Sequence, residues 1–145
     1  YDLGYENLNF KSSVQGFYSN IVTTNFYLNI LDVPYFSFLQ PTLTNEFKNH
    51  ITNQEKEFVN KFKKNLSFYD YSVENYYKSI NKFYKEANKL LSKTDINYLN
   101  LSYLFENIKE TTYWDTVHYN DLGNYQIAYA IANFITSKNF DKNKK

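Results

Sequence analysis

The sequence contains no cysteine and no methionine, only 2 histidines and 3 glycines, and every one of its 16 basic residues is a lysine. The lack of cysteine excludes disulfides, thiolate metal sites and a cysteine nucleophile. Against 15 acidic residues the formal net charge is only +1, which is too small to favour nucleic acid or an anionic membrane surface as a partner. Because translated chains start with methionine and this one starts with Tyr1, we expect it to be a piece of a longer protein.

Long apolar runs are also absent. The longest stretch without charge, residues 12–31, contains serine, threonine, glutamine and asparagine, so no membrane span is predicted. A length of 145 residues with 43% hydrophobic residues is typical of one globular domain. The 16 tyrosines and 13 phenylalanines share AT-rich codons with the abundant lysine and asparagine. A nucleotide bias of the genome is therefore the first explanation for these aromatic residues, ahead of a role in stacking on sugars or bases.

The first third of the chain has the pattern of a helix followed by a strand. Residues 1–16 show no clear period and predict an irregular segment. Apolar positions at helical spacing predict a helix over residues 17–31, which Asp32-Val33-Pro34 ends because the residue before proline disfavours helix. Residues 35–39 are short, aromatic and almost continuously apolar, which predicts a strand buried on both faces of a parallel sheet.

Helix signals dominate the rest of the chain. After a polar connection over residues 40–51, the spacing of Thr52 and Glu55 matches a capping box and predicts a helix over residues 54–66. Ser72 is placed to begin a longer helix over residues 73–91. The remaining predicted segments are a strand over residues 97–101, a helix over 121–137 and a solvated tail over 138–145.

The two histidines are the candidates for acid–base chemistry. His50 lies in the polar connection, which predicts a solvated surface residue. Asp115 precedes His118 by three residues, and in a turn this spacing can place the carboxylate beside the imidazole. The carboxylate would then accept the Nδ1–H and stabilise the imidazolium that forms when Nε2 takes a proton. The alternative is a turn that merely begins the last helix, with Asn120 or Asp121 as the N-cap and His118 packed.

Residues 115–124 resemble the closing block of the SGNH hydrolases, the GDSL-type esterases and lipases. In that block an Asp-x-x-His pair is followed by a turn with asparagine and glycine into the final helix. Residues 33–43 are similar to a strand ending in Leu-Gln-Pro in a bacterial branch of the family. The resemblance covers roughly residues 17–137 and implies an α/β fold, a partial flavodoxin-like parallel sheet flanked by helices and lacking the N-terminal strands. Residues 1–145 are then the C-terminal portion of one such domain.

The resemblance implies that Asp115 and His118 are two members of a Ser-His-Asp triad acting on an acyl or acetyl ester. A small-molecule or carbohydrate ester is the implied substrate, and acyl transfer to a sugar is a close variant. Gln40, at the carboxyl end of the predicted strand, is a candidate substrate-binding residue or a structural residue of the turn before Pro41. The family's nucleophile block and its oxyanion-hole glycine and asparagine are not in this chain, so the isolated chain is predicted to be inactive. The hydrophobic sheet edge left by the missing N-terminal strands is expected to make it poorly soluble.

A noncatalytic module rich in tyrosine and phenylalanine that binds a carbohydrate or a partner protein is the alternative. It predicts aromatic residues clustered on one exposed face, whereas the hydrolase hypothesis predicts mostly buried aromatics and contact between Asp115 and His118. No cofactor and no metal are predicted, because two histidines and scattered carboxylates lack ligand spacing.

Overall fold

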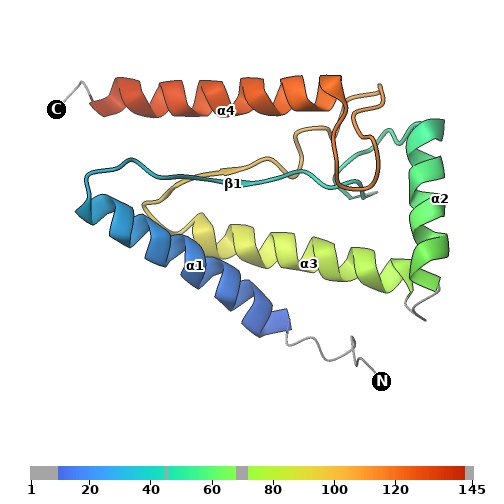
Figure 1. Cartoon of the computed structure of the whole chain (residues 1–145), viewed down its shortest axis with the longest axis horizontal. Coiled ribbons are helices and arrows are strands. Elements are labelled where there is room, and N and C mark those ends of the chain that lie inside the picture. Colours follow the sequence, from blue (N-terminus) through green and yellow to red (C-terminus); the bar gives the residue numbers. More distant parts are fainter. Residues whose placement is uncertain (1–9, 45, 68–71, 143–145) are drawn as a thin grey trace.

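The computed structural model describes residues 10–44, 46–67 and 72–142 and has the predicted α/β class. Its two strands pair in parallel, with Phe36 opposite Asn97 and Leu39 opposite Asn100. Such a pair needs a long crossover, which two helices supply here. In chain order the elements are α1 (Phe10–Ile30), β1 (Phe36–Leu39), α2 (Asn53–Ser67), α3 (Val73–Leu91), β2 (Asn97–Asn100) and α4 (Asp121–Lys142) (Figure 1).

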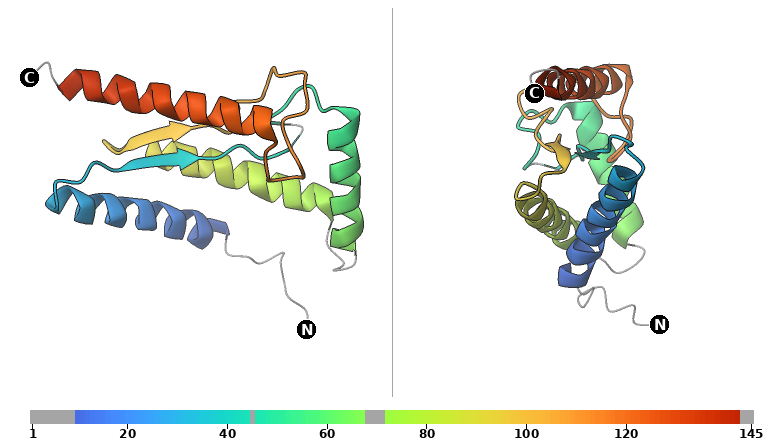
Figure 2. Two further views of the ribbon diagram at one scale, coloured as in Figure 1. Left: turned by 45° about the horizontal axis from the view of Figure 1, so that its top comes forward. Right: turned by 90° about the vertical axis from the view of Figure 1, so that its left-hand side faces the viewer.

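The strands lie between two helical layers. Figures 1 and 2 show α4 along one face of the strands, α1 and α3 along the other, and α2 across one end. Phe36 and Phe38 face α4, and each ring lies 6.2 Å from that of Phe134. Helices therefore cover both faces, although these two phenylalanines are half-buried where full burial is predicted. On the other face Leu39 joins a cluster that also contains Phe17, Phe47, Ile80, Phe83, Tyr84 and Tyr98.

The helix α1 begins at Phe10, so the predicted irregular segment over residues 1–16 is wrong from that residue onward. Residues 1–9 lie outside the described residues. Val14 and Ile21 explain the earlier start, because they lie two turns apart on one helical face and are 5% and 7% exposed. The core contact made by Val14 thus outweighs the weak local pattern.

The ends of α1 and α4 have different causes. As predicted, α1 stops before Pro34: Asp32 takes a φ of 53°, and the N–H of Val33 donates to the carbonyl of Leu28 at 2.9 Å. In contrast, α4 runs to Lys142, so the predicted tail from residue 138 is wrong up to that point. No glycine or proline stops the helix there.

A second core cluster lies at the carboxyl ends of the strands. Leu43, Phe105 and Tyr113 are at most 1% exposed and form its centre. The rings of Phe105 and Tyr113 meet edge to face at 5.4 Å. Because Leu43 follows β1 and the other two follow β2, the cluster fixes the two connections against each other.

Among the helices that the structure describes, none is long and apolar enough to cross a membrane.

Candidate functional site

The candidate site is a short hairpin-like loop between β2 and α4, in which Tyr113 and Tyr119 form an antiparallel bridge. The N–H of Trp114 donates to the carbonyl of His118 at 2.8 Å. Tyr113 is 1% exposed, and the hydroxyl of Tyr119 donates to the carbonyl of Pro41 at 2.6 Å. The base of the loop is therefore held in the core, whereas Trp114 and His118 at its tip are exposed.

Asp115 and His118 are in contact at this tip. The Nδ1 atom of His118 lies 2.6 Å from Oδ2 of Asp115. The other carboxylate oxygen, Oδ1, accepts the backbone N–H groups of Val117 and His118, both at 2.8 Å. The loop backbone thus holds the carboxylate in the orientation in which it meets the imidazole, and the predicted pairing is present.

The electrostatics favour an ionised Asp115. Burial raises the pKa of Asp115, but the hydrogen bonds from the His118 ring and from the N–H groups of His118 and Val117 outweigh it, so the pKa is below its usual value. An ionised Asp115 holds the Nδ1–H of a neutral His118, which leaves a lone pair on Nε2. The side chain of His118 is 77% exposed, so it is not packed in the core and can accept a proton from a group brought to the surface.

The start of α4 is also built into this loop. Oδ1 of Asn120 accepts the N–H of Gly123 at 2.9 Å, which makes Asn120 the N-cap, and its Nδ2 donates to the carbonyl of Thr111 at 2.8 Å. The turn that begins a helix and the carboxylate–imidazole pair therefore coexist. Gly123 passes so close to Thr112 and Tyr119 that a Cβ at this position would clash with both.

The connection after β1 runs beside the loop. The N–H of Leu43 donates to the carbonyl of Thr116 at 3.1 Å, and the Thr42 hydroxyl donates to the same oxygen at 3.4 Å. Gln40 is exposed at the carboxyl end of β1, on the same connection. Its role toward substrate stays a prediction.

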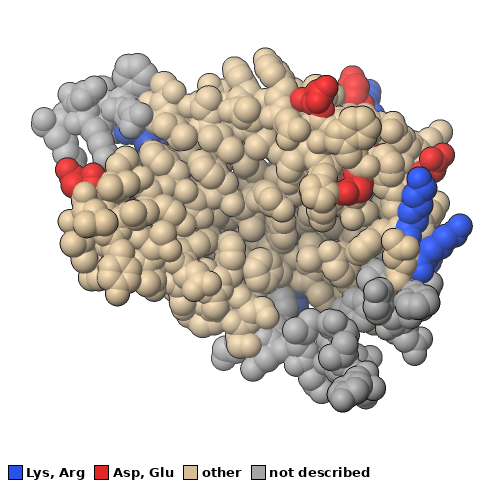
Figure 3. Space-filling model, viewed as in Figure 1, with Lys and Arg blue, Asp and Glu red and all other residues tan. Residues whose placement is uncertain are grey.

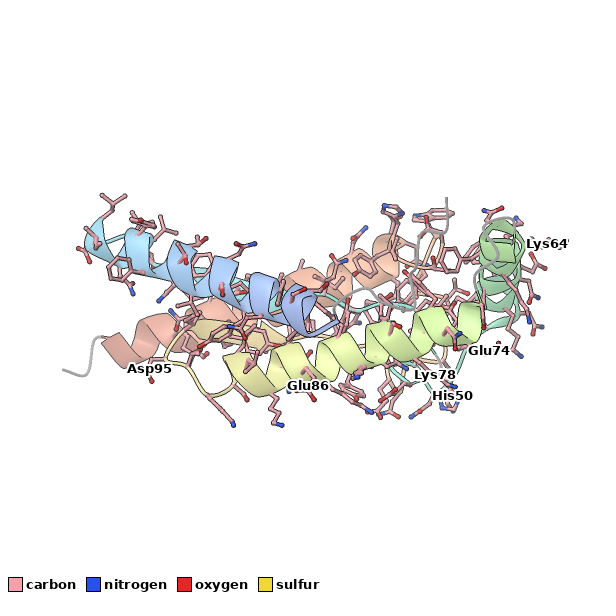
Figure 4. All side chains as sticks on the ribbon, turned by 90° about the horizontal axis from the view of Figure 1, so that it is seen from below. His50, Lys64, Glu74, Lys78, Glu86 and Asp95 are labelled. Carbon is pink, nitrogen blue, oxygen red and sulfur yellow. The ribbon has the colours of Figure 1, made fainter. Side chains whose placement is uncertain are left out.

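His50 lies far along the sequence from the pair of Asp115 and His118. It is exposed, as predicted, in the connection between β1 and α2, where Figure 4 labels it. It lines an open surface hollow of about 510 Å³ together with Lys48, Asn49, Ile51, Thr52, Lys56 and Lys109.

No serine hydroxyl hydrogen-bonds to the His118 ring within residues 10–44, 46–67 and 72–142. Ser102, which follows β2, is 1% exposed and donates to Oδ1 of Asn100 at 2.7 Å. In the same described ranges, no group of three His, Cys, Asp or Glu side chains is placed to hold a metal ion.

Sequence reasoning missed one part of the site, the burial of Lys48. Its side chain is fully buried and pairs with Glu55 at 2.7 Å. The capping box predicts a role for Glu55 at the start of α2, and both of its hydrogen bonds are present at 3.0 and 3.2 Å. The capping box uses only one carboxylate oxygen of Glu55. The other oxygen is left to bind a further donor, and this was the only indication in the sequence that Glu55 has another partner.

Compared with models of protein families, with curated proteins and with solved structures, the chain matches none of them.

Proposed function

We propose that this chain supplies the histidine and the aspartate of a Ser-His-Asp ester hydrolase, and that the serine belongs to a part of the protein outside this chain. The single observation that carries the proposal is the 2.6 Å contact between Nδ1 of His118 and Asp115, with the ring exposed. The resemblance of residues 115–124 to the closing block of SGNH hydrolases agrees with it.

The chemistry follows the usual order for such a triad. Nε2 of His118 takes the proton of the serine hydroxyl as its oxygen attacks the ester carbonyl, and Asp115 stabilises the imidazolium. The Nε2–H then protonates the leaving alcohol, and an acyl-enzyme remains. Water attacks the acyl-enzyme in hydrolysis, whereas a sugar hydroxyl attacks it in acyl transfer.

Apolar surface beside β1 supports a partner segment that brings the serine. Phe26, Tyr27, Ile30 and Leu31 at the end of α1 are 60–69% exposed. The face seen in Figure 1 presents the outer side of β1 between α4 and α1, and Figure 3 shows mostly uncharged side chains over the middle and left of this face, with acidic ones over its right-hand part. Parallel sheets are normally covered and extended on both sides, so further strands and helices fit here.

The test is ester hydrolysis by the longer protein that carries this chain together with the proposed serine. With p-nitrophenyl acetate as substrate, we expect His118→Ala to lower kcat/KM by about 10³-fold or more, since the proton acceptor is lost. His50→Ala is the matched control and should leave the rate unchanged. Equal activity of the two variants would contradict the proposal.

A second candidate function has one observation in its favour. Trp114, Tyr125 and Tyr129 are each about 60% exposed, and the two tyrosine rings stack at 6.3 Å with an angle of 16°. Such rings suit the apolar face of a sugar. Because Trp114 is the sole tryptophan, titration of oligosaccharides against its fluorescence tests this noncatalytic binding function directly.

A further inference from the structure

A fully buried ion pair lies under the loop that carries Asp115 and His118. Lys48 comes from the connection after β1 and Glu55 from the first turn of α2, and their side chains are both 0% exposed with Nζ and Oε1 2.7 Å apart. Burying two charges costs free energy that such a pair recovers only with further hydrogen bonds. The residues that make those further hydrogen bonds are therefore the part of the chain that the pair fixes in place.

The pair holds residues 110–112. Nζ of Lys48 donates to the carbonyl of Glu110 at 2.7 Å and to the hydroxyl of Thr112 at 3.0 Å. Oε1 of Glu55 accepts the N–H of Thr112 at 3.0 Å and its hydroxyl at 3.3 Å. The other oxygen, Oε2, accepts the N–H of Thr52 in the capping box. Oε2 of Glu55 therefore serves the capping box, whereas Oε1 binds Thr112.

Thr112 is the residue from which the loop starts. Its carbonyl accepts the N–H of Asn120 at 3.0 Å, which closes the loop at its base. The next pair is the bridge between Tyr113 and Tyr119, and beyond it the N–H of Trp114 reaches the carbonyl of His118. A fixed Thr112 therefore sets the position of both sides of the loop.

We propose that Lys48 and Glu55 are positioning residues for the Asp115–His118 pair, an inference that rests on the function proposed above. They fix Thr112, and through it the loop backbone whose N–H groups hold the Asp115 carboxylate. The four hydrogen bonds between the pair and residues 110–112, two donated by Lys48 and two accepted by Glu55, distinguish this role from simple filling of the core, for which apolar side chains suffice.

The test compares amide hydrogen exchange in this chain with that of K48M/E55L, which removes the pair without leaving a buried charge. We expect exchange at the N–H groups of Val117 and His118, which bond to Asp115, to rise about tenfold or more. Amides of α3 should keep their protection. Lys85→Ala, which breaks the exposed Lys85–Glu46 pair, is the matched control and should change neither set.

A second readout is the titration of the Asp115 carboxyl group. Its pKa should rise toward the usual value in K48M/E55L, because the hydrogen bonds that lower it are weakened. Should that variant fail to fold, Thr112→Val removes the shared hydroxyl and permits the same comparison. Uniform loss of protection across the chain, or unchanged exchange at Val117 and His118, would overturn the inference. Neither readout requires hydrolysis, so failure here is distinct from failure of the proposed function.

Discussion

Replacing Gly123 with alanine should disrupt the packing of α4 against the loop. An added Cβ would lie 3.0 Å from Cβ of Tyr119 and 3.3 Å from the carbonyl carbon of Thr112, and still closer to the carbonyl oxygen. Ordinary contacts begin at 3.4 Å, and none of these atoms can rotate away. The helix or the loop must therefore shift as a unit.

The magnitude follows from two opposing effects. Overpacking of this kind costs about 1–3 kcal/mol. Alanine recovers up to about 1 kcal/mol through its higher helix propensity. We expect Gly123→Ala to lower the free energy of unfolding by about 1–2 kcal/mol, as measured by urea denaturation followed by circular dichroism.

Gly16 gives a matched control within the same chain. It lies inside α1, and an added Cβ meets nothing within 4 Å. Gly16→Ala should therefore raise the free energy of unfolding by up to about 1 kcal/mol. If both alanine variants were stabilised equally, the close approach of Gly123 to Thr112 would be wrong, and with it the account of how α4 fixes the loop.

Two further predictions concern the anchors of the loop. Tyr119→Phe should cost about 1 kcal/mol of unfolding free energy in urea denaturation, because the carbonyl of Pro41 loses its partner. Tyr27→Phe is the control, because Tyr27 is an exposed tyrosine of α1, and it should leave the unfolding free energy unchanged. An equal loss in both variants would contradict a specific hydrogen bond from Tyr119 to Pro41. Burial raises the pKa of Glu55, but hydrogen bonds from Lys48 and from backbone N–H groups outweigh it, so the net pKa is below 4.5. Charged Glu55 therefore stabilises the fold above about pH 4.5, and this stability is lost as the pH falls through the lowered pKa. In Glu55→Gln the unfolding free energy should be lower at pH 7 and should depend less on pH between 5 and 3, and an unchanged acid transition would refute this.

Local signals predicted much of the fold. The capping box of Thr52 and Glu55, the N-cap Ser72 and the stop before Pro34 are short-range patterns, and each is present in the structure. The three-residue spacing of Asp115 and His118 is local too, because the bonds that hold the carboxylate come from the same turn.

Tertiary contacts account for what the sequence did not predict. Val14 is buried on the same helical face as Ile21, and this core contact extends α1 to Phe10 although the serines and the glycine of this segment weaken the local helix signal. Lysine at position 48 is expected at the surface from its type alone. Its burial depends on Glu55 and Thr112, which are 7 and 64 residues away, so no window of sequence contains all three.

The most direct test of the central claim is fluorophosphonate labelling of the proposed protein in which this chain is joined to the part that carries the serine, because this reagent reacts with activated serines. The account predicts one labelled serine outside this chain, loss of labelling in His118→Ala, and retained labelling in His50→Ala. It also predicts that the chain by itself is not labelled. Labelling that persists in His118→Ala, or that falls on a serine of this chain, would contradict the assignment of His118 as the general base.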